Sequence, residues 1–199
     1  MGLNLEHKDG DTLLSFEELD KIIPKYITNR SQLDELEQDN IEDAIQWIFS
    51  LRNLKPEKIF SREFQNNLHK KMLGKVWKWA GKTRTRETNI GVLPFQIENQ
   101  RKILNDDAIF WVNNNTWNPL ELSLRFHHRL VQIHCYPNGN GRHSRIMANI
   151  ILTKIFKLEE IEWLGGNLVN ENEYRKIYIK AMKSADKRDY KLLFECIKK

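Results

Sequence analysis

Apolar residues recur at helical spacing along most of the chain, so the pattern predicts a largely helical protein. The clearest run is 61–80, where one stripe holds Phe64, Leu68, Met72, Val76 and Trp77. A second long run opens with Asn118-Pro119, and proline suits the first position of a helix. We predict helices over 42–51, 61–80, 119–134, 145–156, 171–184 and 188–197.

Residues 88–97, with the sequence TNIGVLPFQI, break the helical pattern. They are rich in Ile, Val and Phe, contain Gly91 and Pro94, and follow the basic stretch KTRTRE. β-branched and aromatic residues interrupted by glycine and proline favour extended chain over helix. We predict a short β-hairpin or an extended flap, and a plain loop between helices is the alternative.

Composition narrows the class of protein. The chain has 199 residues, of which 40% are hydrophobic, enough for one domain with a sizeable core. No apolar run approaches the roughly 18 residues that span a bilayer, and the first residues lack the pattern of a secretory signal. Two cysteines, Cys135 and Cys196, make no disulfide framework and no Cys-x-x-Cys metal pair. We expect a soluble cytoplasmic protein with no membrane partner.

Charge is unevenly spread along the chain. Residues 1–40 hold ten acidic and four basic residues, a net charge of −6, and the remainder carries +11. A basic body attracts polyanions such as a nucleic acid, a nucleotide or an acidic protein. The acidic front end is either a solvated face or a segment that lies across the basic body and competes for its anion.

Residues 134–145, with the sequence HCYPNGNGRHSR, carry the candidate chemistry. The pattern predicts that one helix ends at the histidine, that a tight loop with Gly139 and Gly141 follows, and that a new helix begins near Arg142. Glycines let successive backbone N–H groups turn inward into a cradle for an anion. The N-terminus of the new helix adds its unpaired N–H groups and the positive end of its dipole.

Two arginines and a histidine complete this constellation. Arg142 and Arg145 are three residues apart, so they share a helix face and can reach two phosphates. His134 stands at the rim of the cradle, with a pKa suited to removing a proton near neutral pH. A base beside a phosphate cradle indicates phosphoryl or nucleotidyl transfer. The structural alternative is a helix–turn–helix junction with its arginines in solvent.

The same stretch resembles the signature of the Fic family, His-x-Phe-x-(Asp/Glu)-Gly-Asn-Gly-Arg-x-x-Arg. The letters in register are His134, Gly139, Asn140, Gly141, Arg142 and Arg145. Upstream, residues 79–84 read Trp-Ala-Gly-Lys-Thr-Arg, similar to the Trp-Ala-Gly-x-x-Arg stretch that precedes a target-docking hairpin in Fic proteins. The order of elements over about residues 40–160 matches the family core, and the chain also resembles the mobile-element-associated bacterial branch of the family.

The resemblance implies an all-α Fic fold, a helical bundle with a short β-hairpin flap beside the active site. It implies an acidic N-terminal helical segment over 1–39, the Fic core over 40–160 and C-terminal helices packed on the core over 161–199. The implied reaction is transfer of AMP from ATP to a Ser, Thr or Tyr hydroxyl of a target protein, which can be the chain itself. Pyrophosphate leaves.

Residue roles follow from the same resemblance. His134 is expected to be the general base, and Gly139, Asn140 and Gly141 the anion hole, with Asn140 also at the α-phosphate. Arg142 and Arg145 are expected to bind the ATP phosphates. The flap residues expected to dock the target are Asn89, Ile90, Gly91, Val92 and Leu93. Members of the family that transfer the γ-phosphate tend to have lysine where this chain has Gly141, so glycine favours AMP transfer.

Two positions depart from the signature. Tyr136 replaces phenylalanine, so its hydroxyl needs a partner. Asn138 replaces the Asp or Glu that holds Mg²⁺ on the nucleotide phosphates, and an amide oxygen is a weaker ligand for Mg²⁺ or Mn²⁺ than a carboxylate. This change motivates an alternative function, a catalytically silent Fic fold that binds a nucleotide or a partner.

Many Fic proteins are inhibited by a Ser/Thr-x-x-x-Glu-(Gly/Asn) helix whose glutamate pairs with the second signature arginine. Ser31 and Glu35 have this spacing, within the acidic front end. We therefore expect Glu35 or Glu37 to pair with Arg145 and to compete with a phosphate for it. A surface helix with solvated acids is the alternative, and a small antitoxin-like inhibitor, typical of a bacterial toxin-like system, is the other source of inhibition. The basic charge alone allows a helical nucleic-acid-binding protein, but without a recognition pattern we expect no nucleic-acid partner.

Overall fold

The computed structural model describes residues 12, 14–164 and 172–197, and this part of the chain is helical without a β-strand. The predicted all-α fold class is confirmed. In chain order the elements are α1 (Phe16–Leu19), α2 (Arg30–Ser50), α3 (Pro56–Ile59), α4 (Arg62–Leu73), the 3₁₀ helix η1 (Pro94–Gln96), α5 (Ile97–Asn113), α6 (Pro119–Ile133), α7 (Asn140–Ile150), the π-helical segment η2 (Ile151–Phe156), α8 (Asn172–Ala185) and α9 (Lys191–Glu195).

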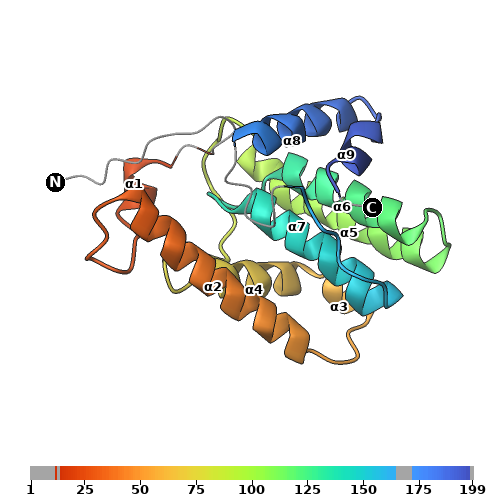
Figure 1. Ribbon diagram of the computed structural model, residues 1–199, viewed down its shortest axis with the longest axis horizontal. Coiled ribbons are helices and arrows are strands. Elements are labelled where there is room, and N and C mark those ends of the chain that lie inside the picture. Colours follow the sequence, from red (N-terminus) through yellow and green to blue (C-terminus); the bar gives the residue numbers. More distant parts are fainter. Residues whose placement is uncertain (1–11, 13, 165–171, 198–199) are drawn as a thin grey trace.

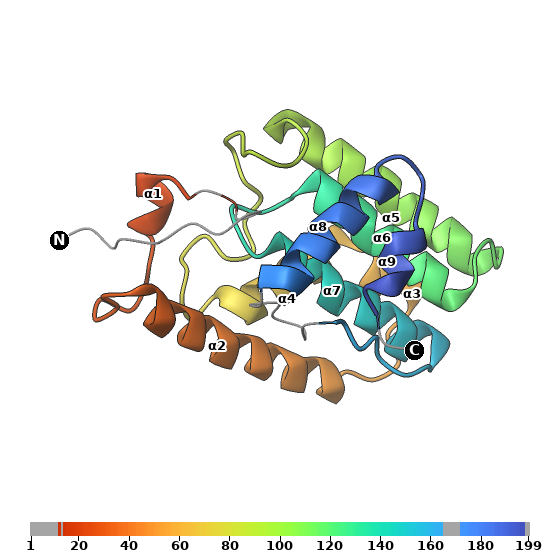
Figure 2. The same ribbon diagram turned by 45° about the horizontal axis from the view of Figure 1, so that its top comes forward.

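The helices pack in three groups (Figure 1). α5, α6 and α7 lie at the centre, α2 runs along one side together with α4, and α8 and α9 cover the other side. The view in Figure 2 shows α8 lying over α6 and α7. The main hydrophobic core joins α2 and α4 to α5, α6 and α7. A second, smaller core joins α6 and α7 to the C-terminal helices through Leu124, Ala148, Ala181 and Leu193.

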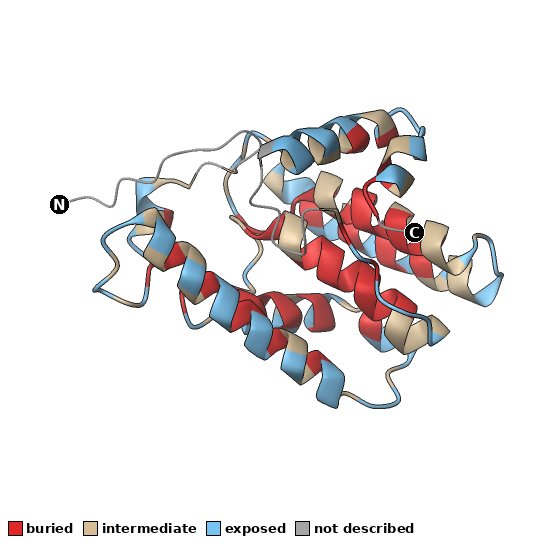
Figure 3. Ribbon diagram, viewed as in Figure 1, coloured by how far each residue is buried: buried red, intermediate tan, exposed pale blue. Residues whose placement is uncertain are grey.

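Burial follows this arrangement (Figure 3). α6 and α7 are buried over most of their surface, whereas α2 alternates between a buried and an exposed face. A helix that is hydrophobic on one stripe covers a core, and one that is buried all round lies inside it. The loop between α6 and α7 therefore begins and ends in the best-packed part of the molecule.

The start of α6 and both ends of the α6–α7 loop are defined by local backbone chemistry. Asn118 caps α6 by accepting a hydrogen bond from the Glu121 N–H at 2.9 Å, and Pro119 takes the first helical position as predicted. α6 ends at His134, which adopts a left-handed conformation with φ of 56°. α7 begins directly after Gly139, which has φ of 78°.

The predicted helix over 61–80 is too long. α4 ends at Leu73, and the next residues instead pair with the N-terminal segment through the Ile23 N–H to Val76 O (2.8 Å) and the Lys78 N–H to Lys21 O (3.0 Å). These long-range bonds replace the helical ones. Val76 and Trp77 remain buried. The apolar stripe therefore identified core residues correctly, but the helix predicted for residues 74–80 was wrong.

The predicted β-hairpin is not formed over the described residues 88–93. Their backbone groups bond to side chains rather than to a partner strand: the Val92 carbonyl accepts from Arg84 Nη2 (2.5 Å) and the Ile90 carbonyl from Thr88 Oγ1 (2.6 Å). Because no strand ladder can form on groups that are already engaged, the segment is an irregular loop followed by η1. We call residues 88–93 the flap loop.

The described part of the acidic front end pairs with basic residues of the body, which agrees with the second of the two alternatives and not with a fully solvated face. Glu18 of α1 pairs with Arg86, and Glu37 of α2 pairs with Arg142. α2 is continuous through residues 39 and 40, so the proposed boundary between the acidic segment and the core falls inside one helix. Within the described residues, no helix is both long and apolar enough to cross a membrane.

Candidate active site

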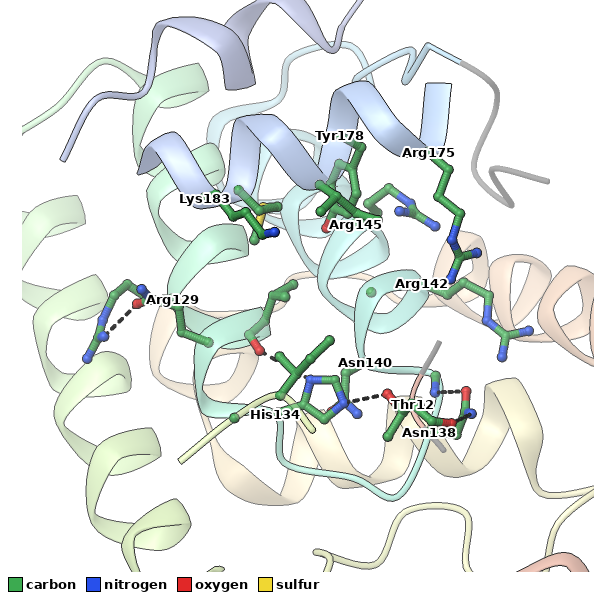
Figure 4. A pocket seen from close by; sticks show the side chains of 18 of the residues that line it. Thr12, Arg129, His134, Asn138, Asn140, Arg142, Arg145, Arg175, Tyr178 and Lys183 are labelled. Atoms are coloured by element: carbon green, nitrogen blue, oxygen red, sulfur yellow. Dashed lines mark hydrogen bonds between the residues drawn. The ribbon is translucent and has the colours of Figure 1, made fainter. Parts of the chain in front are cut away.

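A cavity of about 640 Å³ opens between the α6–α7 loop, the start of α7, the flap loop and α8 (Figure 4). All seven residues that the sequence assigned to catalysis, phosphates or metal line it: His134, Asn138, Gly139, Asn140, Gly141, Arg142 and Arg145. The flap loop contributes Ile90, Gly91 and Val92 to the wall, whereas Asn89 and Leu93 are not among its lining residues. α8 forms the opposite wall with Arg175, Tyr178 and Lys183, which sequence reasoning did not single out.

The two glycines of the loop have different physical roles. A Cβ on Gly139 would stand 2.6 Å from Leu73 Cδ1, in addition to the left-handed backbone, so this position accepts only glycine without strain. A Cβ on Gly141 would meet nothing closer than Arg145 Nη1 at 4.0 Å. Gly139 therefore allows the tight turn, and Gly141 keeps open the space in front of α7. No side chain caps this helix start, which leaves its first N–H groups directed at the cavity.

His134 presents one ring nitrogen to the cavity. Nδ1 lies 3.3 Å from the carbonyl oxygen of Val131, and Nε2 lies 2.9 Å from the hydroxyl oxygen of Thr12. A carbonyl can only accept, so the proton belongs on Nδ1, and Nε2 is free to accept from the hydroxyl. Figure 4 shows the imidazole directed at Thr12. The geometry is that of a base holding an alcohol.

The expected near-neutral pKa of His134 is wrong for this closed arrangement. Burial, and secondarily the charge of Arg84, lowers the pKa of His134 to about 4. The imidazole is consequently neutral at pH 7 and has its lone pair available on Nε2. Negative phosphates entering the cavity would raise its pKa, because an adjacent anion favours the protonated form.

Arg84, the last letter of the Trp-Ala-Gly-x-x-Arg stretch, holds His134 in place. Its Nε donates to the His134 carbonyl at 2.6 Å, its Nη2 to Val92 O, and the side chain is buried. The guanidinium thus covers the end of α6, where the helix carbonyls lack partners, and links this end to the flap loop. Gly91 permits the contact, since a Cβ there would stand 2.5 Å from His134 Cβ.

His69 in α4 is a positioning residue that sequence reasoning missed. Its Nδ1 accepts from the Gly81 N–H at 2.9 Å, so its Nε2 carries the proton and donates to the Asn138 carbonyl at 3.0 Å. Burial holds the pKa of His69 well below its usual value, which keeps this tautomer neutral. His69 also stacks on Tyr136, with ring centroids 3.8 Å apart. A lone histidine on an apolar helix face gave no signal of this role.

Tyr136 has the partner that its hydroxyl needs. The hydroxyl lies 3.0 Å from Asn66 Oδ1, and Asn66 also accepts from the buried Arg101 at 2.8 Å. The ring is buried between His69 and His143. Tyrosine therefore replaces phenylalanine here without leaving a polar group unpaired.

The two asparagines of the loop bond to the loop itself. Asn140 accepts from the Tyr136 N–H (2.9 Å) and donates to the Tyr136 carbonyl (2.8 Å), which closes the turn. Asn138 Oδ1 accepts from the Gly139 N–H at 2.6 Å, and its Nδ2 donates to the Thr12 carbonyl at 3.3 Å. The Asn138 side-chain oxygen thus already accepts one backbone hydrogen bond, which leaves one lone pair for another partner. Among the described residues no group of three or more His, Cys, Asp or Glu is placed to hold a metal ion.

The acidic partner of the arginine pair differs from the prediction. Glu37 is buried and pairs with Arg142 (Nη1 to Oε2, 2.5 Å), not with Arg145. Its other oxygen accepts from Trp77 Nε1. Arg145 is itself buried and lies over the ring of Tyr178, with its guanidinium carbon 5.5 Å from the centroid. Ser31 and Glu35 lie exposed on the outer face of α2 and bond to each other at 3.4 Å.

Part of the chain matches a known protein family and known proteins. Residues 59–152 match the model of the Fic/DOC family. The chain is 30% identical over 95 residues to protein adenylyltransferase fic-1 of Caenorhabditis elegans, covering 44% of this chain and 18% of that protein. It is 26% identical over 136 residues to protein adenylyltransferase Fic of Nematostella vectensis, covering 64% of this chain and 31% of that protein. The chain thus spans a third or less of these curated relatives.

Solved structures share the fold. A fragment of Fic-1 from C. elegans superposes with a TM-score of 0.64 at 22% identity, covering 90% of this chain and 50% of that one. BepC from Bartonella tribocorum, solved with bound AMPPNP, superposes with a TM-score of 0.66 at 15% identity, covering 92% and 96%.

Fold and site together define a helical domain in which an uncapped helix start and two arginines face a buried histidine across one cavity. Residues 59–152 of the chain form a Fic/DOC family domain.

Proposed function

We propose that this chain is a protein adenylyltransferase, which transfers AMP from ATP to a Ser, Thr or Tyr hydroxyl of a protein. The observation that carries the proposal is the alcohol already bonded to His134 Nε2, in the same cavity as the open start of α7. The curated relatives named protein adenylyltransferases support it, as does the AMPPNP complex of BepC. A cytoplasmic setting, where ATP is present, belongs to the same proposal.

In this proposal His134 is the general base. Its neutral Nε2 takes the proton of the acceptor hydroxyl as the oxygen attacks the α-phosphorus, and the bond from that phosphorus to the pyrophosphate oxygen breaks. The Val131 carbonyl fixes the imidazole in the tautomer that this step needs, and Arg84 holds the backbone of His134. Holding base and hydroxyl at hydrogen-bond distance removes the entropic cost of bringing them together.

The phosphates bind to fixed donors in this proposal. The first N–H groups of α7 receive the α-phosphate, in the space that Gly141 keeps open. Arg142 and Arg145 bind the β- and γ-phosphates, which leave as pyrophosphate. A divalent cation, Mg²⁺ or Mn²⁺, would bind with the nucleotide in this proposal, with Asn138 as the residue of this chain placed to contact it.

Inhibition is part of the same proposal. Glu37 holds Arg142 as a charge-assisted pair, so a phosphate must displace a buried carboxylate before it reaches that guanidinium. The competing group therefore sits on the first signature arginine rather than the second. Ser31 and Glu35 face away and take no part in this contact.

Label transfer from α-labelled ATP tests the proposal. Wild-type protein is incubated with the nucleotide, Mg²⁺ and a cell lysate, and His134→Ala is the matched variant. We expect protein-bound label that falls by roughly 10²–10⁴-fold in the variant, while its ATP affinity stays within a few-fold of wild type. ATP binding with no label in either protein would instead identify a silent nucleotide-binding domain.

A further inference from the structure

Thr12 occupies the position that an acceptor hydroxyl requires. Its Oγ1 lies 2.9 Å from His134 Nε2, the nitrogen that accepts a proton, and Thr12 lines the same cavity as Gly141 and the two arginines. Figure 4 shows this hydroxyl as the group at which the imidazole is directed.

The main chain of Thr12 is held as well as its side chain. Its carbonyl oxygen accepts from Asn138 Nδ2 at 3.3 Å. Two residues of the signature loop, His134 and Asn138, therefore bind the same threonine. The Thr12 hydroxyl is thus held at the base by contacts to both its side chain and its main chain.

The segment that follows Thr12 is anchored to the Fic core. Ser15 caps α1 together with Glu18, whose carboxylate receives both Nε (2.9 Å) and Nη2 (2.5 Å) of Arg86. Trp79 Nε1 also donates to the Glu18 carbonyl at 3.3 Å. Ser15 is three residues from Thr12, so the hydroxyl stays within about 10 Å of this anchor. A tether this short gives an effective concentration in the millimolar range or above.

We propose that Thr12 is the self-modification site of this chain and that it receives AMP from ATP bound in the same cavity. The inference rests on the proposed function and names its first acceptor. His134 Nε2 takes the Thr12 hydroxyl proton, Oγ1 forms a bond to the α-phosphorus, and the bond from that phosphorus to pyrophosphate breaks with its electron pair leaving on pyrophosphate. The product is a threonyl phosphodiester of AMP, and the proton on His134 passes to solvent.

Occupation of the base by Thr12 also bears on other targets. A foreign hydroxyl can reach His134 only after Thr12 has left, since both need the same lone pair. Removal of the Thr12 hydroxyl should therefore abolish self-labelling without reducing transfer to external proteins.

Peptide mapping after incubation of the full-length protein with α-labelled ATP and Mg²⁺ tests this inference. Wild type, Thr12→Ser and Thr12→Ala are compared. Each is also made in a Glu37→Gln background, so that the ion pair between Glu37 and Arg142 does not prevent ATP from binding. Thr28→Ala is the control, because Thr28 is an exposed threonine of the same segment that is hydrogen-bonded to Gln32.

We expect the adenylyl group on the peptide that contains Thr12 in wild type, Thr12→Ser and Thr28→Ala, and a loss of at least about tenfold in Thr12→Ala. The fraction labelled per minute should not depend on protein concentration, as an intramolecular step requires. Self-labelling that stays unchanged in Thr12→Ala, or that maps to another peptide, overturns the inference. If lysate proteins are labelled in the same experiment, the proposed function still holds. No label on any protein, from any variant, overturns both.

Discussion

Alanine at the two glycines of the signature loop should have opposite effects on stability and binding. At Gly139, alanine must adopt φ of 78°, which costs about 1–2 kcal/mol for a residue with a Cβ. Its Cβ would also stand 2.6 Å from Leu73 Cδ1, and such overpacking costs about 1–3 kcal/mol. The sum predicts a loss of about 2–5 kcal/mol, or a midpoint of thermal unfolding lowered by about 5–15 °C.

Gly141→Ala should leave the fold intact and block the nucleotide. Position 141 lies inside α7, and a Cβ there has no atom closer than 4.0 Å. Alanine at this second residue of the helix should therefore add about 0.4–1 kcal/mol of stability, because it restricts the unfolded chain more than glycine does; this is a rise of about 2 °C in the midpoint of thermal unfolding. Its methyl group would fill the space in front of the helix start, and we expect ATP affinity to fall about tenfold or more.

Thermal unfolding by circular dichroism and ATP titration by calorimetry measure both effects in the same two variants. Gly139→Ala is the control for general damage to the loop, because it loses stability first and affinity only as a consequence. A Gly141→Ala protein that is as stable as wild type and binds ATP equally well would refute the assignment of the phosphate site to the start of α7.

Three further predictions concern the buried histidines, Asn138 and Glu37. Burial lowers the pKa of His127 and His143 to about 3 and that of His134 to about 4. The unfolded chain therefore binds more protons below pH 6.5, and stability present above that pH should be lost as the pH falls toward 3. Urea unfolding at pH 7 and pH 5 should differ by about 2 kcal/mol per histidine, and equal midpoints would contradict these shifts. Asn138→Asp keeps the acceptor for the Gly139 N–H and adds a charged oxygen, so the Mg²⁺ concentration for half-maximal label transfer should fall; an unchanged metal dependence would show that residue 138 is not a metal ligand. Glu37→Gln keeps an acceptor for Trp77 Nε1 but removes the negative charge that pairs with Arg142. Self-labelling should rise about tenfold, whereas a rate equal to that of wild type would exclude Glu37 as an inhibitor.

The sequence could predict the site because the site is local. His134 and the α6–α7 loop lie within twelve consecutive residues, and their chemistry follows from the end of one helix and the start of the next. The same signature also indicated the fold class. Glu37 was identified as a candidate inhibitor, but the predicted partner was wrong, because the packing of α2 and α4 against α7 decides that Glu37 meets Arg142 and not Arg145.

Buried polar residues explain much of what the sequence did not show. α5 was not predicted, because Arg101 and Asn105 occupy buried positions on the face that also carries Leu104 and Ala108. They interrupt the apolar period on which a helix prediction depends. Arg101 donates through Nη1 and Nη2 to Asn66 and Glu98, and the contact with Asn66 is visible only in three dimensions. His69 escaped notice for the same reason.

The long-range pairing of the N-terminal segment was equally hidden. The strand-like contacts of residues 21–23 with 76–78 ended α4 early, and the flap loop lost its hairpin to the side chains of Arg84 and Thr88. In both places a tertiary hydrogen bond outweighs local propensity, since each buried backbone group needs one partner and takes the one that the packing offers. Thr12 reaches His134 through this same tertiary arrangement.

The central claim is that AMP, and not phosphate, moves to a hydroxyl activated by His134. The most direct measurement incubates the wild-type protein and His134→Ala in parallel with ATP labelled at the α-phosphorus or at the γ-phosphorus. We predict protein-bound label from α-labelled ATP only, with the γ-label recovered in pyrophosphate, and no label in His134→Ala. Protein-bound γ-label, or α-label that persists in His134→Ala, would contradict this account.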